Sequence, residues 1–442
     1  MSLPILQGGH DWPSVLLERA GQVDPEAGIE AAEAAGAWEA HSSAVTDLSP
    51  EAVIALISES GLRGRGGAGF GTGRKWRDCA SQPVQQRYVV ANGFEADPGA
   101  QVDRTLMELD PHAIVEGVAL AAFAVRAEEA IIAVRASAAT AVARLRRAIA
   151  EAEARGHIGT RGDGSSRALR IEVRELSGSF VLGEETVLLR ALESRRAQPD
   201  QRPPYPSRHG LWGKPTVVNN VKTLATVPWI VRHGAGAFAA IGTPESPGTT
   251  LLQLGGVVRR PGIAEVPLGA TAREVLDGPG GSVEGALKAI LVGGPTGGFL
   301  PPDALDTPLT YEALAAAGTL AGSGSLLALG ETTCLVDLAT LMTRYLSDQA
   351  CGKTIPCRIG TRRLAELGDA FCGGRVRPTD AALLDDLARD MRDAALCGLE
   401  AQAPNLLLSG MRYFAAEFED HIVRGHCPAG VCQPISLAGA AR

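Results

Sequence analysis

The 442-residue sequence contains no apolar run that could cross a bilayer. A membrane-spanning helix needs about 18 or more apolar residues. The most apolar segment, residues 113–125, is shorter and includes Glu116. The first residues, Met-Ser-Leu-Pro-Ile-Leu-Gln, also lack the basic and apolar regions of a signal peptide. We therefore expect a cytoplasmic protein with no membrane span.

An excess of positive charge is missing as well. The formal net charge is −8 at pH 7, which disfavours general affinity for nucleic acids or anionic membranes. Apolar residues make up 45% of the chain, and no internal repeats are visible. A chain of this length and composition is expected to fold into more than one globular domain.

The most informative segment is residues 61–76, where seven of the first thirteen residues are glycine. Glycine at this density indicates tight turns or close approach of the backbone to a ligand. Arg63, Arg65, Arg74 and Lys75 add cationic donors. Exposed amides beside basic side chains typically bind phosphate, so this glycine loop predicts a nucleotide site.

The glycine loop differs from the usual dinucleotide fingerprint, although Gly64, Gly66 and Gly69 match its G-x-G-x-x-G spacing. That fingerprint follows a strand and precedes an acidic residue by about 20 positions. Here residues 50–62 have helical periodicity, and glutamines occupy the later position. An ordinary Rossmann motif is therefore disfavoured.

The pattern of elements divides the chain into four parts. Residues 1–47 form an N-terminal extension with few structural cues. From 48 to 245, helices alternate with strands at 88–91, 130–134 and 169–173, which predicts a mainly parallel sheet. Short strands broken by glycine and proline predict a small α+β module at 246–330, and helical patterns continue from 331 to 442.

Seven of the eight cysteines lie in the last quarter of the chain. In a reducing compartment, such clustering favours a metal or iron–sulfur site over disulfides.

Four segments, in unbroken order from about residue 48 to 432, resemble the flavin-bearing, NADH-oxidising subunit of respiratory complex I, soluble hydrogenases and formate dehydrogenases. They are the glycine loop, the run 92–99, the motifs Gly183-Glu184-Glu185-Thr186 and Asn219-Asn220, and the cysteine region. The resemblance implies an α/β fold with a Rossmann-like FMN/NADH domain, a ubiquitin-like β-grasp (SLBB-like) module and a helical bundle holding a [4Fe–4S] cluster.

The resemblance also implies the cofactor-binding residues. The phosphates of FMN and NADH would be lined by Gly64, Arg65, Gly66, Gly67 and Lys75. The flavin and its ribityl chain would be hydrogen-bonded by Asn92, Asn219, Asn220 and Thr223. The same cofactor-binding set includes Phe180, Gly183 and Val218.

For the dinucleotide, the resemblance implies that Glu184 and Glu185 lie beside it and that Phe70 and Tyr205 sandwich its adenine. Glu95 and Asp97 would be the catalytic residues, beside the stacked nicotinamide and flavin. Taken alone, a Glu-Glu pair at a helix start complements the helix dipole, and an Asn-Asn pair usually marks a turn. Their order after the glycine loop favours the cofactor role.

The cysteine motif departs from the family pattern Cys-x-x-Cys-x-x-Cys with a remote fourth cysteine. The chain has Cys351, Thr354 and Cys357, with Cys397 as the remote member. A cubane is normally held by four thiolates, and a threonine hydroxyl is a poor substitute. Three outcomes stay open: a cluster on three cysteines and an oxygen ligand, replacement by Cys372 or Cys334, or no cluster.

Two further departures concern charge near the flavin. The family usually has an acidic residue at the position of Phe94 and a glutamate at the position of Lys222. Both changes put the flavin contacts in question, although neither removes the phosphate cradle.

The end of the chain carries a separate donor set, in which Cys427 and Cys432 follow His421 and His426. Mixed histidine and cysteine donors suit zinc or an iron–sulfur centre. A reactive or structural cysteine pair is the alternative.

The resemblance predicts a subunit that transfers hydride between NAD(P)H and FMN and passes single electrons onward. The expected partners are a thioredoxin-like [2Fe–2S] subunit and a larger iron–sulfur or catalytic subunit. The alternative is a degenerate scaffold without redox activity, which the residues at 94, 222 and 354 motivate.

Overall fold

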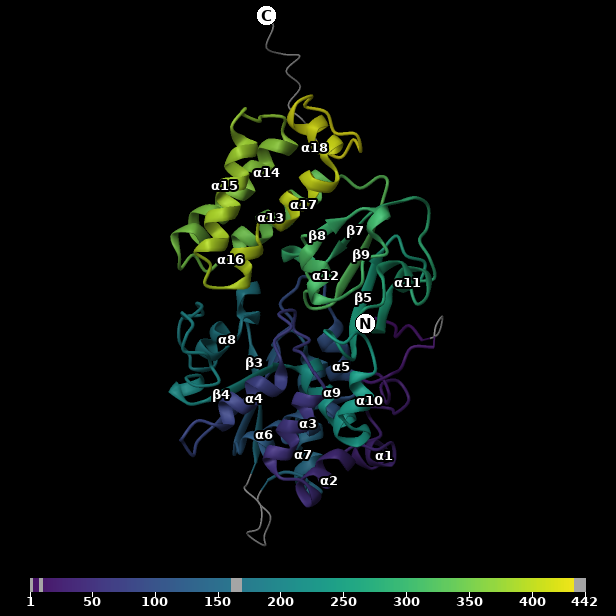
Figure 1. Ribbon diagram of the computed structural model, residues 1–442, viewed down its shortest axis with the longest axis vertical. Helices are drawn as coiled ribbons and strands as arrows, with labels where there is room; N and C mark the ends of the chain where they lie inside the picture. Colours follow the sequence, from purple (N-terminus) through teal and green to yellow (C-terminus); the bar gives the residue numbers. More distant parts are fainter. Residues whose placement is uncertain (1–2, 8–10, 160–168, 433–442) are drawn as a thin grey trace, which may run out of the picture.

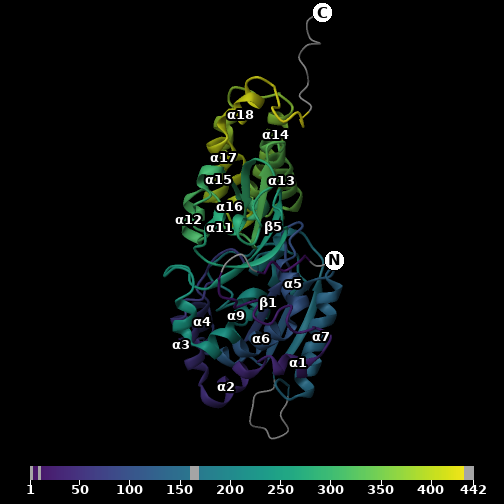
Figure 2. The same ribbon diagram turned by 90° about the vertical axis from the view of Figure 1, so that its right-hand side faces the viewer.

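The computed structural model describes residues 3–7, 11–159 and 169–432, which form two lobes along a common long axis (Figures 1 and 2). The lower lobe of Figure 1 contains one sheet, and the upper lobe contains a second sheet and a helical region. No helix in the described ranges combines the length and apolar character needed to cross a membrane.

The first sheet is parallel, in the order β3-β2-β1-β4. Its strands are β1 (Tyr88–Gly93), β2 (Glu129–Arg135), β3 (Arg170–Leu176) and β4 (Thr216–Asn220). Residues 89–91 are fully buried, as expected for a parallel strand covered on both faces. The strands predicted at 88–91, 130–134 and 169–173 are thus confirmed.

Helices cover both faces of this sheet (Figure 1). α6 (Pro111–Val125), α7 (Ala139–Ala154) and α9 (Val221–His233) pack together on one face. α8 (Glu185–Leu192) contributes Leu188 and Leu189 to the apolar cluster on the other. α5 (Val102–Leu109) and α10 (Ala235–Ala239) complete the lobe.

The glycine loop connects two helices of this lobe. α3 (Pro50–Glu59) begins after Ser49, whose side chain accepts a hydrogen bond from the Ala52 amide at 3.1 Å. α4 (Thr72–Ala80) begins directly after the loop. A helix therefore precedes the loop, as the periodicity predicts.

The second sheet has the order β6-β5-β9-β7-β8 and mixes parallel and antiparallel pairs. Its strands are β5 (Thr249–Gly256), β6 (Gly262–Pro267), β7 (Leu287–Val292), β8 (Gly298–Leu300) and β9 (Ser325–Gly330). Two short helices, α11 (Ala272–Asp277) and α12 (Tyr311–Ala316), accompany it.

The helical region follows β9. It comprises α13 (Leu335–Gln349), α14 (Thr361–Cys372), α15 (Asp380–Asp393), α16 (Gly398–Gln402), α17 (Asn405–Tyr413) and α18 (Ala415–Ile422). Its apolar core also contains Phe94 and Val181 from the lower lobe and Phe299 from the second sheet. The helical region is therefore packed against both sheet-containing regions.

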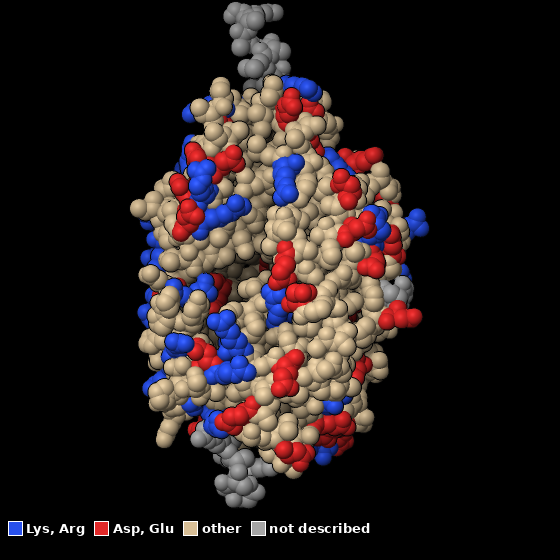
Figure 3. Space-filling model, in the orientation of Figure 1, with Lys and Arg blue, Asp and Glu red and all other residues tan. Residues whose placement is uncertain are grey.

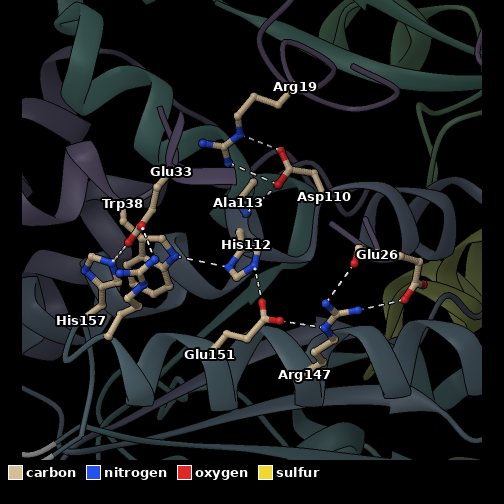
Figure 4. Close-up of polar contacts among 11 residues, drawn as sticks. Arg19, Glu26, Glu33, Trp38, Asp110, His112, Ala113, Arg147, Glu151 and His157 are labelled. Atoms are coloured by element: carbon tan, nitrogen blue, oxygen red, sulfur yellow. Dashed lines mark hydrogen bonds and ion pairs between the residues drawn. The ribbon is translucent and has the colours of Figure 1, made fainter. Parts of the chain in front are cut away.

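The N-terminal segment is fastened to the lower lobe by a polar network (Figure 4). It includes α1 (Ile29–Ala34) and α2 (Glu39–Asp47). Arg19 pairs with Asp110 at 3.0 Å. The Trp38 indole donates to His112 Nδ1 at 3.3 Å, and His112 Nε2 lies 3.2 Å from Glu151. Burial lowers the pKa of His112, which suits a neutral ring that accepts from Trp38 and donates to Glu151.

Candidate cofactor and metal sites

The predicted cofactor residues converge where β1 and β4 end. These parallel neighbours pair Asn92 with Asn220 and Ala91 with Asn219. β2 lies on one side of β1 and β4 on the other, so the carboxyl ends flank a switch point, where open α/β sheets usually bind ligands. In Figure 3, the surface is hollowed between the lobes, with charged side chains along the rim.

The glycine loop lies against the same strand ends. The Arg65 amide donates to Thr223 Oγ1 at 2.8 Å, and a Cβ on Gly66 would lie 3.1 Å from that of Asn220. Gly67 has φ +109°, and its Cβ would meet the Gly322 carbonyl at 3.0 Å. Only glycine fits this close approach between the lobes.

The cationic side chains of the loop have different roles. The Arg65 side chain is only 2% exposed and donates to the carbonyls of Thr249 and Pro247. It therefore braces the loop against β5, and its guanidinium is bonded to backbone carbonyls. Lys75 Nζ binds Glu185 at 3.0 Å and the Val218 carbonyl at 2.8 Å, which leaves it half-buried beside the strand ends.

The predicted flavin-contacting amides are tied to their neighbours. Asn92 Nδ2 donates to the Gly183 carbonyl at 2.9 Å. The Asn219 side chain accepts from the Trp76 indole at 2.9 Å. Asn220 Nδ2 donates to Asp103 at 2.6 Å. These bonds hold each amide in one orientation at the strand ends.

The two predicted catalytic acids lie beside this network. Glu95, at φ +43°, accepts from the amides of Asp103 and Arg104 at 2.7 and 3.1 Å, in the first turn of α5. Burial, and then the nearby Asp103, raise the pKa of Glu95 to about 7. Asp97 accepts from the Ser323 hydroxyl, and burial raises its pKa as well.

The two unusual residues near the flavin position are both buried. Lys222 is fully buried, and its Nζ lies 3.3 Å from Asp103 and donates to the Ser323 carbonyl. Phe94 is also fully buried, in the apolar core shared with the helical region. Phe94 therefore has a packing role, while Lys222 places a paired cation next to Glu95 and Asp97.

Of the residues predicted to contact the dinucleotide, Glu184 and Glu185 lie at the start of α8. Glu184 caps α8 by accepting from the amides of Thr186 and Val187. Its other oxygen accepts no hydrogen bond in the described part of the chain but lies 3.6 Å from the Arg202 guanidinium. Phe70 and Tyr205 are 46% and 52% exposed. Arg74 and Lys75 lie over the Phe70 ring, at 5.6 and 5.9 Å from its centroid.

Phe180 lies at the boundary with the helical region. Its amide donates to Gln349 at 2.8 Å, and its ring meets Tyr345 edge-on at 6.2 Å between centroids. This position joins the lower-lobe site to α13.

These features fit a phosphorylated flavin. The loop exposes Gly66 and Ala68 a few residues before α4, and Lys75 lies in the first turn of that helix. Exposed glycine-loop amides beside a cation bind phosphate.

The motif cysteines surround a polar pair. Cys357 and Cys397 are buried, whereas Cys351 is half-buried. The Thr354 hydroxyl donates to Glu400 and accepts from the Cys357 amide at 3.0 Å. Cys357 lies in a short π-helical segment, Pro356–Gly360, a feature often found at functional sites.

No other thiol completes this motif within the described residues. Cys334 and Cys372 lie with the C-terminal cysteines instead. The donor set of three thiols beside Thr354 and Glu400 does not fit a cluster held by four thiolates. The donors present are three thiols, one hydroxyl and one carboxylate.

The C-terminal donors form a compact second site. The ligand atoms of Cys334, His421, Cys427 and Cys432 all lie within 4.8 Å of one another. The Cys334 sulfur is 3.7 Å from that of Cys432 and 3.4 Å from His421 Nε2. Tetrahedral zinc with bonds of about 2.3 Å to sulfur and 2.0 Å to nitrogen requires separations of about 3.8 and 3.5 Å.

The histidine of this site is oriented for metal binding. His421 Nδ1 lies 2.8 Å from the Glu417 carbonyl, so the proton on Nδ1 leaves Nε2 free to bind a metal. His426, by contrast, is exposed. The sequence pattern grouped His426 with this site and missed Cys334, which precedes α13 and is brought there by the packing of α18 on α13.

Two family models match the chain. Residues 57–229 match the Nuo51 FMN-binding domain, and residues 337–421 match the NADH-ubiquinone oxidoreductase-F iron-sulfur binding region.

Two relatives and one solved structure illustrate the similarity. The HndC subunit of the NADP-reducing hydrogenase of Solidesulfovibrio fructosivorans is 41% identical over 93% of this chain and 84% of its own. The F 2 subunit of the NADH-quinone oxidoreductase of Rhizobium meliloti (strain 1021) is 37% identical over 90% of this chain and 94% of its own. A crystal structure of an NAD+-reducing [NiFe]-hydrogenase in the H2-reduced state gives a TM-score of 0.82 at 30% identity, over 95% of this chain and 68% of that chain.

Proposed function

Because the chain belongs to the family of NADH-quinone oxidoreductase F subunits and related hydrogenase subunits, we propose that it admits electrons to a multisubunit oxidoreductase. It transfers hydride between NAD(P)H and FMN and passes single electrons to iron–sulfur clusters of partner subunits. The observation that carries this proposal is the contact of the glycine loop with Asn220, which pairs with Asn92 at the ends of β4 and β1, and with Thr223 in the first turn of α9.

The chain's contribution to hydride transfer is positional. The amides of Gly66 and Gly67, together with Lys75, hold the FMN phosphate. Gly64 and Arg65, whose amides bond Phe70 and Thr223, shape the loop around it. The asparagines at the strand ends orient the ring system. Phe70 and Tyr205 stack on the adenine, and Glu184 and Glu185 hold the dinucleotide. FMN itself supplies the two-electron chemistry, so no protein acid or base is required at the reacting atoms.

Glu95 and Asp97 set the electrostatics beside the nicotinamide. Their raised pKa values favour the neutral carboxyl forms, which add little negative charge next to a flavin that is being reduced. The paired Lys222 supports the same balance.

The finer architecture is part of the proposal. The Rossmann-like FMN/NADH domain spans residues 48–245, the β-grasp module 246–330 and the helical bundle 331–442, with residues 1–47 as an N-terminal extension. The change of sheet between β4 and β5 and the start of α13 after β9 support these boundaries.

We further assign a single metal ion, with zinc as the best fit, to Cys334, His421, Cys427 and Cys432. The sulfur and nitrogen separations match a closed tetrahedral site. Such an ion joins α18 and the C-terminal segment to the start of α13, which is a structural role.

Partner subunits are expected because the relatives are subunits of larger enzymes. We propose a thioredoxin-like [2Fe–2S] subunit and a larger iron–sulfur or catalytic subunit. Ile355 and Ile359, 68% and 50% exposed beside Cys357, supply apolar surface where electrons would leave.

The experiment is flavin reduction by the purified FMN-loaded protein. We expect a yellow protein whose flavin absorbance bleaches anaerobically with NADH and which reduces ferricyanide. Asn220→Ala should lose flavin, whereas Asn405→Ala in the upper lobe should not. A colourless protein, or bound FMN that neither NADH nor NADPH reduces, would favour the scaffold alternative.

A further inference from the structure

The polar pair beside the motif cysteines contains an unusual buried acid. Glu400 is only 1% exposed and lies in the first turn of α16, three residues after Cys397. Its carboxylate accepts from the Thr354 hydroxyl and, through Oε2, from the Leu396 amide at 3.0 Å. Since Thr354 already accepts from the Cys357 amide, its own proton is directed at Glu400. Both oxygens of Glu400 act as acceptors, which is the pattern of an ionised carboxylate.

The charge of Glu400 has no cationic side chain to balance it. Within residues 3–7, 11–159 and 169–432, no ion pair joins Glu400 to lysine, arginine or histidine. A buried carboxylate without a cation is costly, and such groups are usually paired or bound to a metal. The other buried glutamate of the helical region, Glu417, has Lys288 at 2.8 Å.

The same carboxylate lies within electrostatic reach of all three motif thiols, Cys351, Cys357 and Cys397. The Glu400 amide also donates to the Cys397 sulfur. Glu400, three residues after Cys397, therefore bonds the residue that stands where the motif lacks its fourth cysteine.

We propose that the Glu400 carboxylate replaces the missing thiolate and is the fourth ligand of an iron–sulfur cluster held by Cys351, Cys357 and Cys397. A carboxylate is an anionic donor and binds iron readily. A threonine hydroxyl is neutral and is a poor iron ligand. Thr354 is then a positioning residue, which donates to Glu400 and fixes the ligating oxygen. Iron supplies the positive charge that the protein does not. This inference rests on the proposed function for the presence of a cluster, but its ligand set is specific to this chain.

The test compares iron content and EPR spectra of the anaerobically purified, full-length protein and its variants. We expect the wild type to hold about four iron atoms and four acid-labile sulfides per chain. Glu400→Gln keeps the size and the acceptor for Leu396 but removes the anionic ligand. It should lose about one iron per cluster and gain the EPR signal of an oxidised three-iron cluster.

A second substitution makes the test specific. Thr354→Cys in the Glu400→Gln background provides a fourth thiolate and should restore about four iron atoms with a cubane spectrum. Thr354→Val, which removes the hydrogen bonds to Glu400 and from the Cys357 amide but leaves the carboxylate in place, should keep four iron atoms but change the spectrum. Glu417→Gln is the matched control, since it alters another buried glutamate of the same region and should leave iron and spectrum unchanged.

The outcomes separate this inference from the proposed function. A four-iron cluster with an unchanged spectrum in Glu400→Gln overturns carboxylate ligation. A wild-type protein that contains a three-iron cluster, or no cluster, also overturns it. If NADH still bleaches the flavin in any of these cases, the proposed function stands while the ligand assignment fails.

Discussion

The cofactor site of the lower lobe and the cysteine sites of the upper lobe are assembled in different ways. In the lower lobe, the predicted residues bind one another. The Arg65 amide donates to Thr223, and Lys75 binds Glu185 and the Val218 carbonyl. In the upper lobe, the cysteines divide into an open group around Glu400 and a compact group around His421. A preformed network can hold a large organic ligand at several points, whereas each metal site depends on a few donors that long-range packing brings together.

The largest effect is expected when one donor is removed from the C-terminal metal site, because that site depends on four side chains only. Cys427→Ser should lose the single metal ion and lower the melting temperature by several degrees, because a structural ion contributes folding free energy directly. Metal analysis and thermal unfolding measure both effects, and bound flavin should be unchanged. Cys79→Ala, which alters the lone cysteine of the lower lobe, is the control. Full metal content in Cys427→Ser would refute the site.

The corresponding change in the lower lobe is Gly67→Ala. The added Cβ would strain a φ of +109° and press on the Gly322 carbonyl, so FMN affinity should fall at least about tenfold, or about 1.4 kcal/mol. Flavin titration measures the affinity, and the metal content should not change. Gly156→Ala is matched, because φ is +75° there but the added Cβ would have no atom of another part of the chain within 4 Å. Equal flavin loss in both variants would contradict a local effect.

The third prediction concerns the buried acids beside the cofactor site, Glu95 and Asp97. The four donors of the C-terminal metal site include no carboxylate. The pKa of Glu95 is raised to about 7 from an ordinary value of 4.5, so the folded protein binds an extra proton between these values. The free energy of unfolding of the flavin-free protein should therefore decrease as pH rises from about 4.5 to 7, by at most about 3 kcal/mol from Glu95.

Glu95→Gln should flatten this pH dependence. Urea unfolding of both proteins at about pH 5 and about pH 8 measures the difference. A parallel pH dependence in the two proteins would show that Glu95 titrates normally.

The smallest expected effect is at the rim of the hollow. Phe70→Leu removes one proposed stacking surface and should raise KM for NADH about fivefold, equivalent to about 1 kcal/mol, with kcat nearly unchanged. Trp212→Leu is the control, since this ring is also exposed, at 48%, but packs on Tyr88. Steady-state kinetics with ferricyanide provide the measurement. A fall in kcat with constant KM would place Phe70 elsewhere in the reaction.

Local patterns in the sequence predict the parts of the fold that depend on short-range order. The apolar run at Val89–Ala91 predicts β1, and Ser49 followed by Pro50 predicts the start of α3. Four separate motifs also predict one cofactor site. The structure brings Asn92, Gly183 and Asn220 together because their strands and loops share one sheet edge.

The donor partners could not be predicted in the same way. Cys334 and His421 are 87 residues apart, and Thr354 and Glu400 are 46 apart. Their pairing depends on how α18 packs on α13 and where α16 lies, which no periodic pattern encodes. The burial of Arg65 is a similar case, because its carbonyl partners at Pro247 and Thr249 belong to the next part of the chain.

The loop between α12 and β9 determines where this protein could be recombined with a relative. Gly322 closes on Gly67, and Ser323 binds both Asp97 and Lys222. Arg65 crosses the same boundary toward β5. A chimaera joined near residue 246 would therefore respect the sequence boundary between the two parts. It would nevertheless take one half of the cofactor site from each parent. Residues 48–330 should therefore be exchanged together, and a crossover at the start of α13 leaves these contacts within one parent.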